Sequence, residues 1–589
     1  MNAANPVLQL RLPLWRSRMM LALVFAGFMA LMARALYLQG WNNDFLQQKG
    51  ENRYSRVIEI SANRGNITDR HGEILAASTP VKSVWAIPED VKATRDQVRQ
   101  LAAALQMPLA ELDKKLAEED REFVYLKRQL SPEQAERVTL LNIPGVHQQR
   151  EYRRYYPAGE VAAHVLGFTG VDEAGQEGIE LAFQSSLAGK NGGRRVIKDR
   201  RGNIVEDVAS VAAPREGKDL ALSIDSKIQY LAFSQLKNAV EVHKAKAGGI
   251  VVLDIRTGEV LALANLPAYN PNNRSLLTGT QLRNRVLTDT FEPGSTIKPF
   301  TIALALDLAK VRPDTVIQTA PGRFTLGNST ISDAHPHGPL TVAEVLQKSS
   351  NVGTAKLAMQ MDRQDMWEIL NKAGFGIQPQ VQFPGAVAGK VRPAKTWRPI
   401  EQVTMSYGYG LSASLLQLAR AYTIFARDGD IAPVTFIKAG GPVLGTPVVS
   451  SETARAVRMM LEMAAGPGGT APRAQVMGYR VAGKTGTAHK LENGNYAEKK
   501  YRGSFVGFAP ASDPRIVVAV MIDEPSNGKY FGGDVAAPVF SAVVGGTLRQ
   551  LGVAPDAPMK PISLPSESEM VKESIRAARG PVLPGQRKA

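Results

Sequence analysis

The longest apolar stretch of the chain lies near its N-terminus. Met19–Ala33 carries no charge, and after Arg34 the run continues through Ala35–Leu38. A helix of about 20 residues spans a bilayer core of roughly 30 Å. Trp15 and Tyr37 flank the run, where amphipathic rings favour the membrane–water interface. We therefore predict a transmembrane anchor over residues 19–38.

The charges around this stretch predict its orientation. Arg11, Arg16 and Arg18 precede it, and residues 1–18 contain no acidic residue, which favours a cytoplasmic N-terminal tail and export of everything after the anchor. Ala33–Ala35 also has the small-x-small form of a signal-peptidase site. The apolar run continues past that site, and a bulky arginine would sit inside it, so an uncleaved anchor is favoured over a cleaved signal peptide.

The region after the anchor has mixed polar and apolar composition. Residues 39–60 are predicted to form a stalk that ends in an extended run, Tyr54–Ile60. Residues 61–215 include a helical pattern over Arg95–Glu119, with apolar positions three and four residues apart. No metal-ligand or nucleophile spacing occurs there. We interpret this region as a non-catalytic pedestal domain.

From residue 216 the pattern changes to buried strands and helices. Gly248–Asp254 and Glu259–Ala264 predict a hairpin, and Pro293-Gly294 introduces a helical run over Ser295–Lys310. Three more strands and a covering helix are expected at Tyr479–Ala488, Ser504–Ala509, Arg515–Ile522 and Val535–Leu551. Strands at both ends with helices between them indicate an α+β domain, an antiparallel sheet between helices, over residues 216–555. The proline-rich residues 556–589 are expected to be a mobile tail.

Composition narrows the possible partners. A length of 589 residues predicts more than one core, and the net charge of +16 favours anionic surroundings. Nucleic acid is the less favoured partner, because the chain has no helix-turn-helix spacing and no Cys/His finger.

With no cysteine, disulfides and thiolate zinc sites are excluded. His335-Pro336-His337 lacks a third ligand in sequence, so neither a metal nor a cofactor is expected.

Three short motifs carry the candidate chemistry. They are Ser295-Thr296-Ile297-Lys298, Ser349-Ser350-Asn351 and Lys484-Thr485-Gly486-Thr487. Each is weak alone, since Ser234–Lys237 and Ser526–Lys529 also fit S-x-x-K. Only Ser295 follows Pro-Gly at a predicted helix start, where free N–H groups favour negative charge. Lys298 then lies one turn along, on the same face.

These residue types suit acyl transfer through a serine. A hydroxyl needs a base to become a nucleophile, and Lys298 can serve if burial and a second ammonium at Lys484 keep it neutral. Ser349 could relay a proton to the leaving amine, and Asn351 could orient the substrate amide and Lys298. The strand carrying Lys484 would form a wall of the site. Thr485, Gly486 and Thr487 on that strand would bind the substrate carboxylate and backbone, and the N–H groups of Ser295 and Thr487 could form an oxyanion hole.

This ordered set is similar to that of penicillin-binding proteins and class A β-lactamases. Further segments resemble the class B penicillin-binding proteins of the division-specific type: Arg64–Gly72, Tyr155–Gly159, Gly175–Glu180, Asp199-Arg200, Tyr269–Arg274, Arg283–Lys298, Lys348–Gly353, Ala509–Pro514 and Gly528–Phe540. In that family the pedestal segments lock the pedestal to the transpeptidase domain.

The resemblance implies a septal peptidoglycan D,D-transpeptidase in the inner membrane, with its catalytic domain in the periplasm. Ser295 would attack the D-Ala-D-Ala stem peptide, form an acyl-enzyme, release D-Ala and crosslink to an acceptor amine. β-Lactams would acylate and inhibit it. Implied partners are a lipid II-polymerising membrane glycosyltransferase and other division proteins.

Several readings stay open at this point. Tyr407 and Tyr409, in Ser406–Gly410, could line the substrate site or pack in a core. Glu177 and Glu180 are interpreted as interface or helix-surface groups rather than paired catalytic carboxylates. A D,D-carboxypeptidase, a β-lactamase and a catalytically silent division scaffold are the alternative functions.

Overall fold

The computed structural model describes residues 13–41, 55–117, 121, 123–198, 204–275, 277–492 and 495–559. The predicted N-terminal tail before residue 13, most of the stalk, Asp199-Arg200 and the C-terminal tail after residue 559 lie outside the described residues. The chain forms two compact units. Unit 1 comprises residues 1–62, 81–151 and 190–216, and unit 2 comprises residues 63–80, 152–189 and 217–589.

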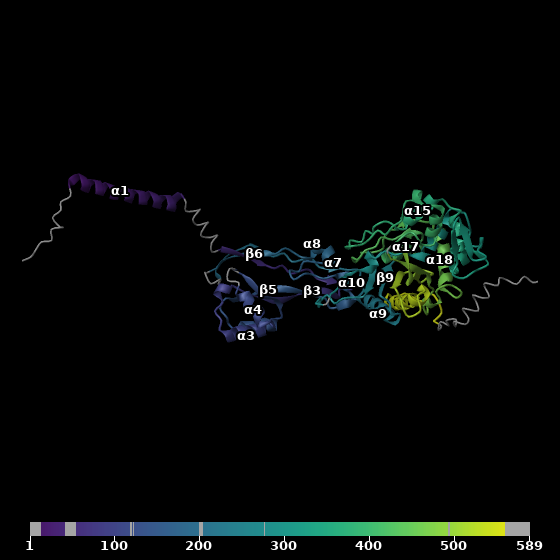
Figure 1. Ribbon diagram of the computed structural model, residues 1–589, viewed down its shortest axis with the longest axis horizontal. Helices are drawn as coiled ribbons and strands as arrows, with labels where there is room; N and C mark the ends of the chain where they lie inside the picture. Colours follow the sequence, from purple (N-terminus) through teal and green to yellow (C-terminus); the bar gives the residue numbers. More distant parts are fainter. Residues whose placement is uncertain are drawn as a thin grey trace, which may run out of the picture. The chain divides into compact units, whose positions relative to one another are not determined.

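The N-terminal apolar stretch forms one continuous helix, α1 (Leu14–Leu36), followed by a π-helical turn over Tyr37–Trp41 (Figure 1). The helix begins at Leu14, earlier than the predicted Met19. None of its side chains is buried within the chain. The stretch Leu14–Gln39 has a hydropathy of 2.0, which by length and composition is enough to cross a membrane, although a signal sequence would meet the same test.

In unit 1 three helices pack beside strands. These are α3 (Arg95–Ala104), α4 (Leu109–Leu116) and α5 (Pro132–Leu140), and the strands are the second half of β3 (Ile74–Ala86) and β4 (Val124–Leu130). The helical stretch predicted over Arg95–Glu119 is present but is divided into α3 and α4. The first helix ends at Ala104, shortly before Gln106 with φ +50°, and Pro108 directly precedes the second. The predicted extended run is confirmed as β1 (Ser55–Ile60), which pairs with β6 (Gly192–Lys198).

The centre of unit 2 is a five-stranded antiparallel sheet in the order β10-β9-β19-β18-β17. Its strands are β9 (Ala247–Asp254), β10 (Val260–Leu266), β17 (Ala482–Glu492), β18 (Asn495–Ala509) and β19 (Ile516–Asp523). The predicted hairpin and the three later strands are thereby confirmed. Among the strands that the structure describes, β17 is at the edge of this sheet, so one of its two sides has no strand partner there.

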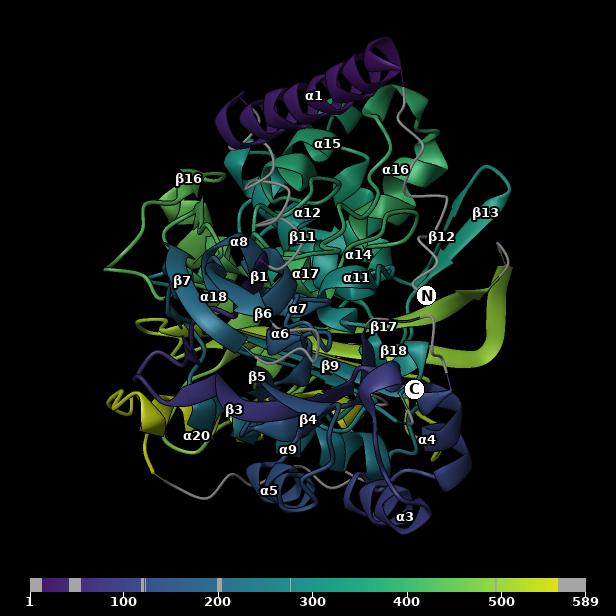
Figure 2. The same cartoon turned by 90° about the vertical axis from the view of Figure 1, so that its left-hand side faces the viewer.

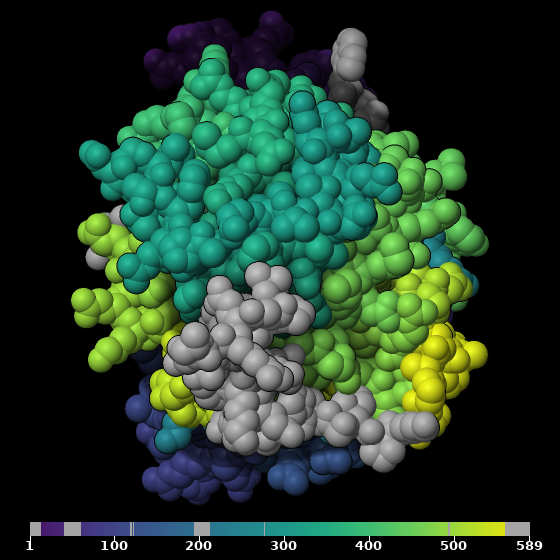
Figure 3. Space-filling model, turned by 90° about the vertical axis from the view of Figure 1, so that its right-hand side faces the viewer, coloured from purple at the N-terminus to yellow at the C-terminus, as the bar shows by residue number. Residues whose placement is uncertain are grey.

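Helices cover both faces of this sheet, as the predicted α+β fold requires. Alternate residues of a strand point to opposite faces. Ile250 and Val252 belong to the core shared with α9 (Ser226–Val242) and α20 (Ala537–Gln550). Val251 and Leu253 belong to the core shared with α17 (Leu415–Ala426). Figure 1 shows α9 and α17 on either side of β9, and Figure 3 shows the teal and green segments of this unit as one continuous surface.

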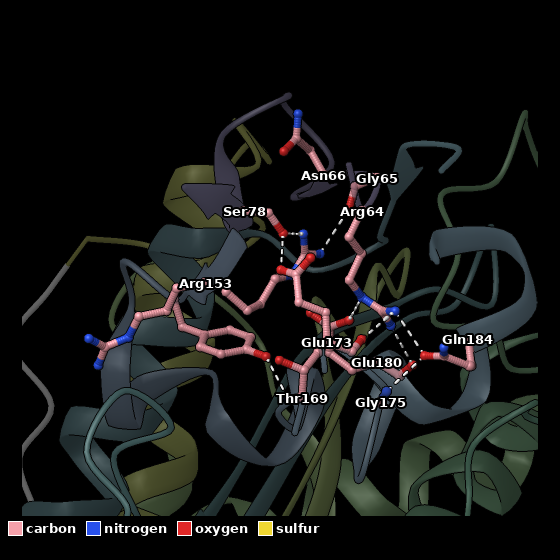
Figure 4. Close-up of polar contacts among 12 residues, drawn as sticks. Arg64, Gly65, Asn66, Ser78, Arg153, Thr169, Glu173, Gly175, Glu180 and Gln184 are labelled. Atoms are coloured by element: carbon pink, nitrogen blue, oxygen red, sulfur yellow. Dashed lines mark hydrogen bonds and ion pairs between the residues drawn. The ribbon is translucent and has the colours of Figure 1, made fainter. Parts of the chain in front are cut away.

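Short segments from the predicted pedestal belong to unit 2 and are joined by a buried ionic network (Figure 4). Glu180, in helix α7 (Gly178–Ala182), is fully buried and accepts from Nε of Arg64 at 2.6 Å and from Nε of Arg154 at 2.7 Å. Arg154 also donates to the Gly65 carbonyl at 2.8 Å. The helix-surface interpretation of Glu180 is therefore wrong, because its carboxylate is the centre of the network.

The same segments contact the rest of unit 2 through Asn272 and Arg274. The Asn272 side chain accepts from the Tyr156 N–H at 3.0 Å and donates to the Tyr156 carbonyl at 2.8 Å. Arg274 donates to the Thr169 carbonyl at 2.8 Å. The division into compact units thus differs from the linear boundary expected at residue 216, since residues 63–80 and 152–189 pack with the sheet domain.

Candidate active site

Ser295 lies in a tight turn directly before a buried helix. The turn is a 3₁₀-helix, Gly294–Ile297, and α12 (Lys298–Asp307) continues from it, so the α-helix starts later than predicted. Gly294 has φ +58°, and the neighbouring Gly408 approaches so closely that a Cβ would lie 2.0 Å from the Gly294 oxygen. Only glycine fits position 408. The turn exposes Ser295 partly, whereas Lys298 is buried completely.

The three motifs meet at the hydroxyl of Ser349. Nζ of Lys298 lies 3.1 Å from Ser349 Oγ and donates to the Ser349 carbonyl at 2.5 Å. Nζ of Lys484, from β17, lies 2.9 Å from the same hydroxyl oxygen. Both lysines have no exposed surface. One hydroxyl group therefore bridges two buried amines that are 186 residues apart in sequence (484 − 298).

Burial dominates the electrostatics of this pair. It lowers the pKa of Lys298 well below the usual range, and the Lys484 ammonium lowers it further, while Asp333 opposes both effects. Burial also lowers the pKa of Lys484, to about 7. The hydroxyl that Lys298 contacts is that of Ser349, and among the described residues no hydrogen bond joins Nζ of Lys298 to the Ser295 hydroxyl. A neutral amine can accept a proton, which is the property that a general base for acyl transfer needs.

The segment after Ser349 is held by Asp333. Ser350 caps helix α14 (Asn351–Ala358) and donates to Asp333 Oδ2 at 2.7 Å, and the Val352 N–H donates to Oδ1 at 2.9 Å. Nδ2 of Asn351 donates to the Ser332 carbonyl at 2.9 Å. Among the bonds of the described residues, Asn351 has none to Lys298, so the expected orienting contact is absent in this arrangement.

The edge strand β17 runs beside the Ser295 turn. A Cβ at Gly486 would lie 2.8 Å from the Pro293 oxygen and 2.5 Å from Ser504 Oγ, so glycine permits this approach. Thr485 Oγ1 is hydrogen-bonded to Thr470 at 2.9 Å. Thr487 Oγ1 accepts from the Gly532 N–H at 3.1 Å. Because that bond uses a lone pair, the Thr487 O–H remains able to donate to a ligand.

Aromatic residues border the same region. Tyr407 is 8% exposed and packs in a small core with Ile331, Ala355 and Val403. Of the two roles considered for its ring, core packing is therefore favoured over lining the substrate site. Tyr409 contacts Tyr496, on β18, with ring centroids 6.1 Å apart.

Glu292, which directly precedes Pro293 and the Ser295 turn, is hydrogen-bonded to both of the neighbouring aromatic segments. It accepts from Tyr496 Oη at 3.0 Å and from the Gly410 N–H at 2.8 Å. In Figure 2 the β17–β18 hairpin and the hairpin of β12 (Arg323–Leu326) and β13 (Ser329–Ser332) project on the same side of the unit.

The other candidate motifs are in unrelated settings. Ser234 lies within α9 and donates to the Leu231 carbonyl, while Lys237 pairs with Glu160 at 2.9 Å. Ser526 donates to the Lys244 carbonyl.

Within the described part of the chain no group of three or more His, Cys, Asp or Glu side chains could hold a metal.

Sequence reasoning missed Asp333, Thr470, Glu292 and Gly532. Asp333 and Thr470 lie in loops with no motif of their own, so no sequence signal could have identified them. Glu292 and Gly532 stand inside segments already singled out, Arg283–Lys298 and Gly528–Phe540. Their contacts depend on partners more than 40 residues away, because Glu292 meets Gly410 and Tyr496 and Gly532 meets Thr487.

Two family models match this chain. The penicillin binding protein transpeptidase domain matches residues 248–545, and the penicillin-binding protein dimerisation domain matches residues 59–222. The first match contains all three motifs. The second covers the predicted pedestal.

Curated relatives and solved structures are similar over long stretches. A probable peptidoglycan D,D-transpeptidase PenA of Neisseria meningitidis is 45% identical over 545 residues, covering 92% of this chain and 93% of the relative. The peptidoglycan D,D-transpeptidase FtsI of Escherichia coli is 42% identical over 550 residues, with the same coverage. The transpeptidase domain of Burkholderia pseudomallei penicillin-binding protein 3 is 55% identical, with a TM-score of 0.53, covering 57% of this chain and 98% of that one.

Proposed function

The chain belongs to the penicillin-binding proteins that combine a transpeptidase domain with a dimerisation domain, and on this premise we propose that it is a serine-type peptidoglycan D,D-transpeptidase with Ser295 as its nucleophile. Its substrates are peptidoglycan stem peptides, and β-lactams acylate the same serine. The observation that carries the proposal is the pair of buried amines on Ser349 Oγ, at 3.1 Å from Lys298 and 2.9 Å from Lys484.

The first half of the reaction forms the acyl-enzyme. Neutral Lys298 takes the proton of the Ser295 hydroxyl as Oγ attacks the carbonyl carbon of the penultimate D-Ala. The N–H groups of Ser295 and Thr487 stabilise the oxyanion. The Ser295 N–H is available because the first N–H groups of a helical turn have no partner within that turn. The Thr487 N–H comes from strand β17. The tetrahedral intermediate collapses with cleavage of the peptide bond. The proton passes from Lys298 through Ser349 to the leaving D-Ala amine.

The second half transfers the acyl group to an acceptor amine. Lys298, now neutral again, removes a proton from that amine as it attacks the ester, and Ser295 regains its hydroxyl proton. Lys484, with Thr485 and Thr487, binds the terminal carboxylate of the donor peptide. Gly486 lets β17 approach the turn, and the free edge of this strand pairs with substrate backbone. Asn351 and Tyr409 complete the substrate-binding groups, with Tyr407 supporting the ring of Tyr409 from the core.

A carboxypeptidase would use the same acyl-enzyme and differ only in its acceptor, which would be water. No observation on this chain favours that alternative. Incubation with pentapeptide-bearing strands separates the two, because a transpeptidase yields crosslinked dimers and a carboxypeptidase yields tetrapeptides.

We propose further that α1 anchors the protein in the inner membrane, with the N-terminus in the cytoplasm and both units in the periplasm at the division septum. Arg11 before α1, Arg16 and Arg18 in its first turns ahead of the apolar stretch Met19–Ala33, and the similarity to FtsI support this. A lipid II-polymerising glycosyltransferase and other division proteins would be its partners. Alkaline phosphatase fused after the span is active only if the downstream chain is exported, and a fluorescent fusion tests the septal position.

Mass spectrometry of the penicillin adduct tests the nucleophile. A single penicilloyl group on the peptide that contains Ser295 is expected, and Ser295→Ala should remove it while the protein stays folded. Ser234→Ala, which changes the other helical S-x-x-K serine, is the matched control and should label normally. Stoichiometric labelling of Ser295→Ala would reject the assignment.

A further inference from the structure

A second polar site lies in unit 2, among residues that the proposed transpeptidase reaction does not use. It is a cavity of about 390 Å³ whose charged lining consists of Arg256, Arg427, Arg455, Arg458, Asp428 and Asp513. Four arginines and two aspartates line the cavity, and Asp430 pairs with Arg427 from outside this lining, so these groups together have a formal excess of one positive charge (4 − 3). We call it the arginine cavity.

Two of the arginines are held in place by backbone carbonyls. Arg458 donates from Nε to the Phe425 carbonyl at 2.9 Å and from Nη2 to the Arg427 carbonyl at 3.0 Å, at the end of α17. Arg427 donates to the Ile255 carbonyl at 2.6 Å and pairs with Asp430 at 2.6 Å. Their side chains are only 15% and 16% exposed. Both guanidinium groups are thus positioned before any ligand arrives, which reduces the entropy cost of binding.

The other two arginines are exposed and held only by exposed aspartates. Arg256 pairs with Asp513 at 3.0 Å, with side chains 53% and 81% exposed. Arg455 pairs with Asp428 at 3.0 Å, with side chains 62% and 57% exposed. Ion pairs between exposed side chains hold their partners only weakly, because water screens both charges. An incoming anion can therefore replace Asp513 most easily, whereas Asp428 also pairs with Arg458 at 3.6 Å and would leave two arginines when displaced.

Unused donors remain at the cavity. In the part of the chain that the structure describes, Nη1 of Arg256, Arg455 and Arg458 has no hydrogen-bond partner. Guanidinium groups bind carboxylates and phosphates through two parallel N–H bonds. The volume lies within the range of small-ligand sites, and the lining is charged rather than apolar.

From these contacts we propose that the arginine cavity binds a small ligand with two oxyanion groups, either carboxylates or phosphates. Arg458, whose Nη1 is unused, forms the fixed floor for one oxyanion, and Arg427 lies beside it with its guanidinium held by Asp430 and by the Ile255 and Val443 carbonyls. The outer arginines, Arg256 and Arg455, exchange their aspartate partners for the second. The segment Ala509–Pro514, which takes no part in the proposed chemistry, supplies Asp513 as one of the displaceable counterions.

Isothermal titration of the full-length protein in detergent tests the proposal. The probes are pyrophosphate and N-acetyl-Glu-Glu-amide, with the neutral N-acetyl-Gln-Gln-amide as the matched control. Saturable binding of at least one anionic probe is expected, with the neutral peptide at least about tenfold weaker. The tighter of the two anionic probes identifies the ligand as phosphate or carboxylate. Absence of saturable binding by both anionic probes overturns the proposal.

Variants then locate the binding. Arg256→Gln combined with Arg455→Gln changes two exposed side chains, so the fold should be retained, and should weaken binding at least about tenfold. Arg99→Gln combined with Arg312→Gln removes the same net charge from two arginines that are 64% and 84% exposed. This control should leave the affinity within about twofold. Equal weakening in both double variants would mean that binding follows net charge, and would overturn the proposal.

The experiment is independent of the proposed transpeptidase reaction. Arg256→Gln/Arg455→Gln should keep normal penicillin labelling, and Ser295→Ala should keep normal anion binding. Failure of one assignment is therefore distinguishable from failure of the other.

Discussion

Nζ of Lys298 lies 3.1 Å from Oγ of Ser349 and 2.5 Å from the carbonyl oxygen of the same residue. Ser349 has φ +60°, in the left-handed region that non-glycine residues rarely adopt. This backbone conformation directs both oxygens of one residue at one amine. Strain of this kind often accompanies functional sites, where the surrounding structure enforces it. Here the conformation of Ser349, in the motif Ser349-Ser350-Asn351, brings that residue into contact with Lys298, the proposed base.

The rate of acylation should depend on pH in a bell-shaped manner. Lys298 must be neutral to act, and its pKa is lowered, so the rate rises as pH increases through that lowered pKa. Lys484 must be charged to bind the substrate carboxylate. Its pKa of about 7 means that this charge is lost as pH rises past neutrality. The second-order rate of penicillin acylation, measured from pH 5 to 10, checks both limbs. A rate that first rises near pH 10 would mean that Lys298 retains an ordinary pKa.

Lys298→Ala should slow acylation by a factor of about 10² to 10⁴, the usual contribution of a general base. Weak, non-covalent binding of penicillin should persist, because the binding groups on β17 are unchanged. Stopped-flow labelling measures the rate, and equilibrium dialysis measures the binding. Lys237→Ala, the lysine of the S-x-x-K sequence in α9, is the control and should acylate normally. A wild-type rate in Lys298→Ala would require another base.

Asp333→Asn should move the rising limb of the pH profile to lower pH. The Asp333 carboxylate raises the pKa of Lys298, so removing its charge lowers that pKa further. An amide also loses one of the two acceptor oxygens that hold Ser350 and Val352, which should cost about 1–3 kcal/mol of stability. Asp314→Asn, at a side chain that is 79% exposed, is the control. If the rising limb of the pH profile did not move, Asp333 would stabilise the fold without affecting the pKa of Lys298.

Thr487→Val should reduce the acylation rate by a factor of about 10 to 100, since a hydrogen bond to a charged group contributes about 1.5–3 kcal/mol. The Gly532 N–H donates to Thr487 Oγ1 and leaves the hydroxyl proton for the substrate carboxylate. Thr487→Ser keeps the hydroxyl and should stay within about threefold of the wild type. If the valine and serine variants acylated equally slowly, the methyl group rather than the hydroxyl would matter.

Glu180→Gln should lower the free energy of unfolding by about 3–5 kcal/mol, the usual cost of breaking a buried ion pair from one side. Arg64 and Arg154 are each 1% exposed and would lose their shared carboxylate. Urea unfolding followed by circular dichroism measures the change. Glu177→Gln, at a half-buried carboxylate three residues earlier in the chain, is the control and should change the stability by less than about 1 kcal/mol.

Much of the fold could be predicted because its signals are local. Strands β9, β10 and β19 of the central sheet are continuous apolar runs, and all of the predicted strands were found. The polar outer parts of β17 and β18, which extend to Glu492 and begin at Asn495, were not predicted. The break between α3 and α4 was missed because the apolar spacing of Arg95–Glu119 continues across it. Glu180 was interpreted as an interface or helix-surface group, and the surface alternative is wrong; it was kept open because an acidic residue is rarely buried unless it is paired. Its partners Arg64 and Arg154 are 116 and 26 residues away in sequence.

The sequence by itself determined which groups are available for chemistry. Pro-Gly before Ser295, a lysine one turn later and a single Lys-Thr-Gly on a predicted strand are local patterns, and their identity does not depend on distant contacts. Only the tertiary structure decided how these groups meet. Burial from all sides lowers the pKa of Lys298 and favours its neutral amine, and the antiparallel sheet brings Lys484 to the hydroxyl that Lys298 already contacts. Desolvation and close approach are properties of the packed chain, so no pattern of neighbouring residues encodes them directly.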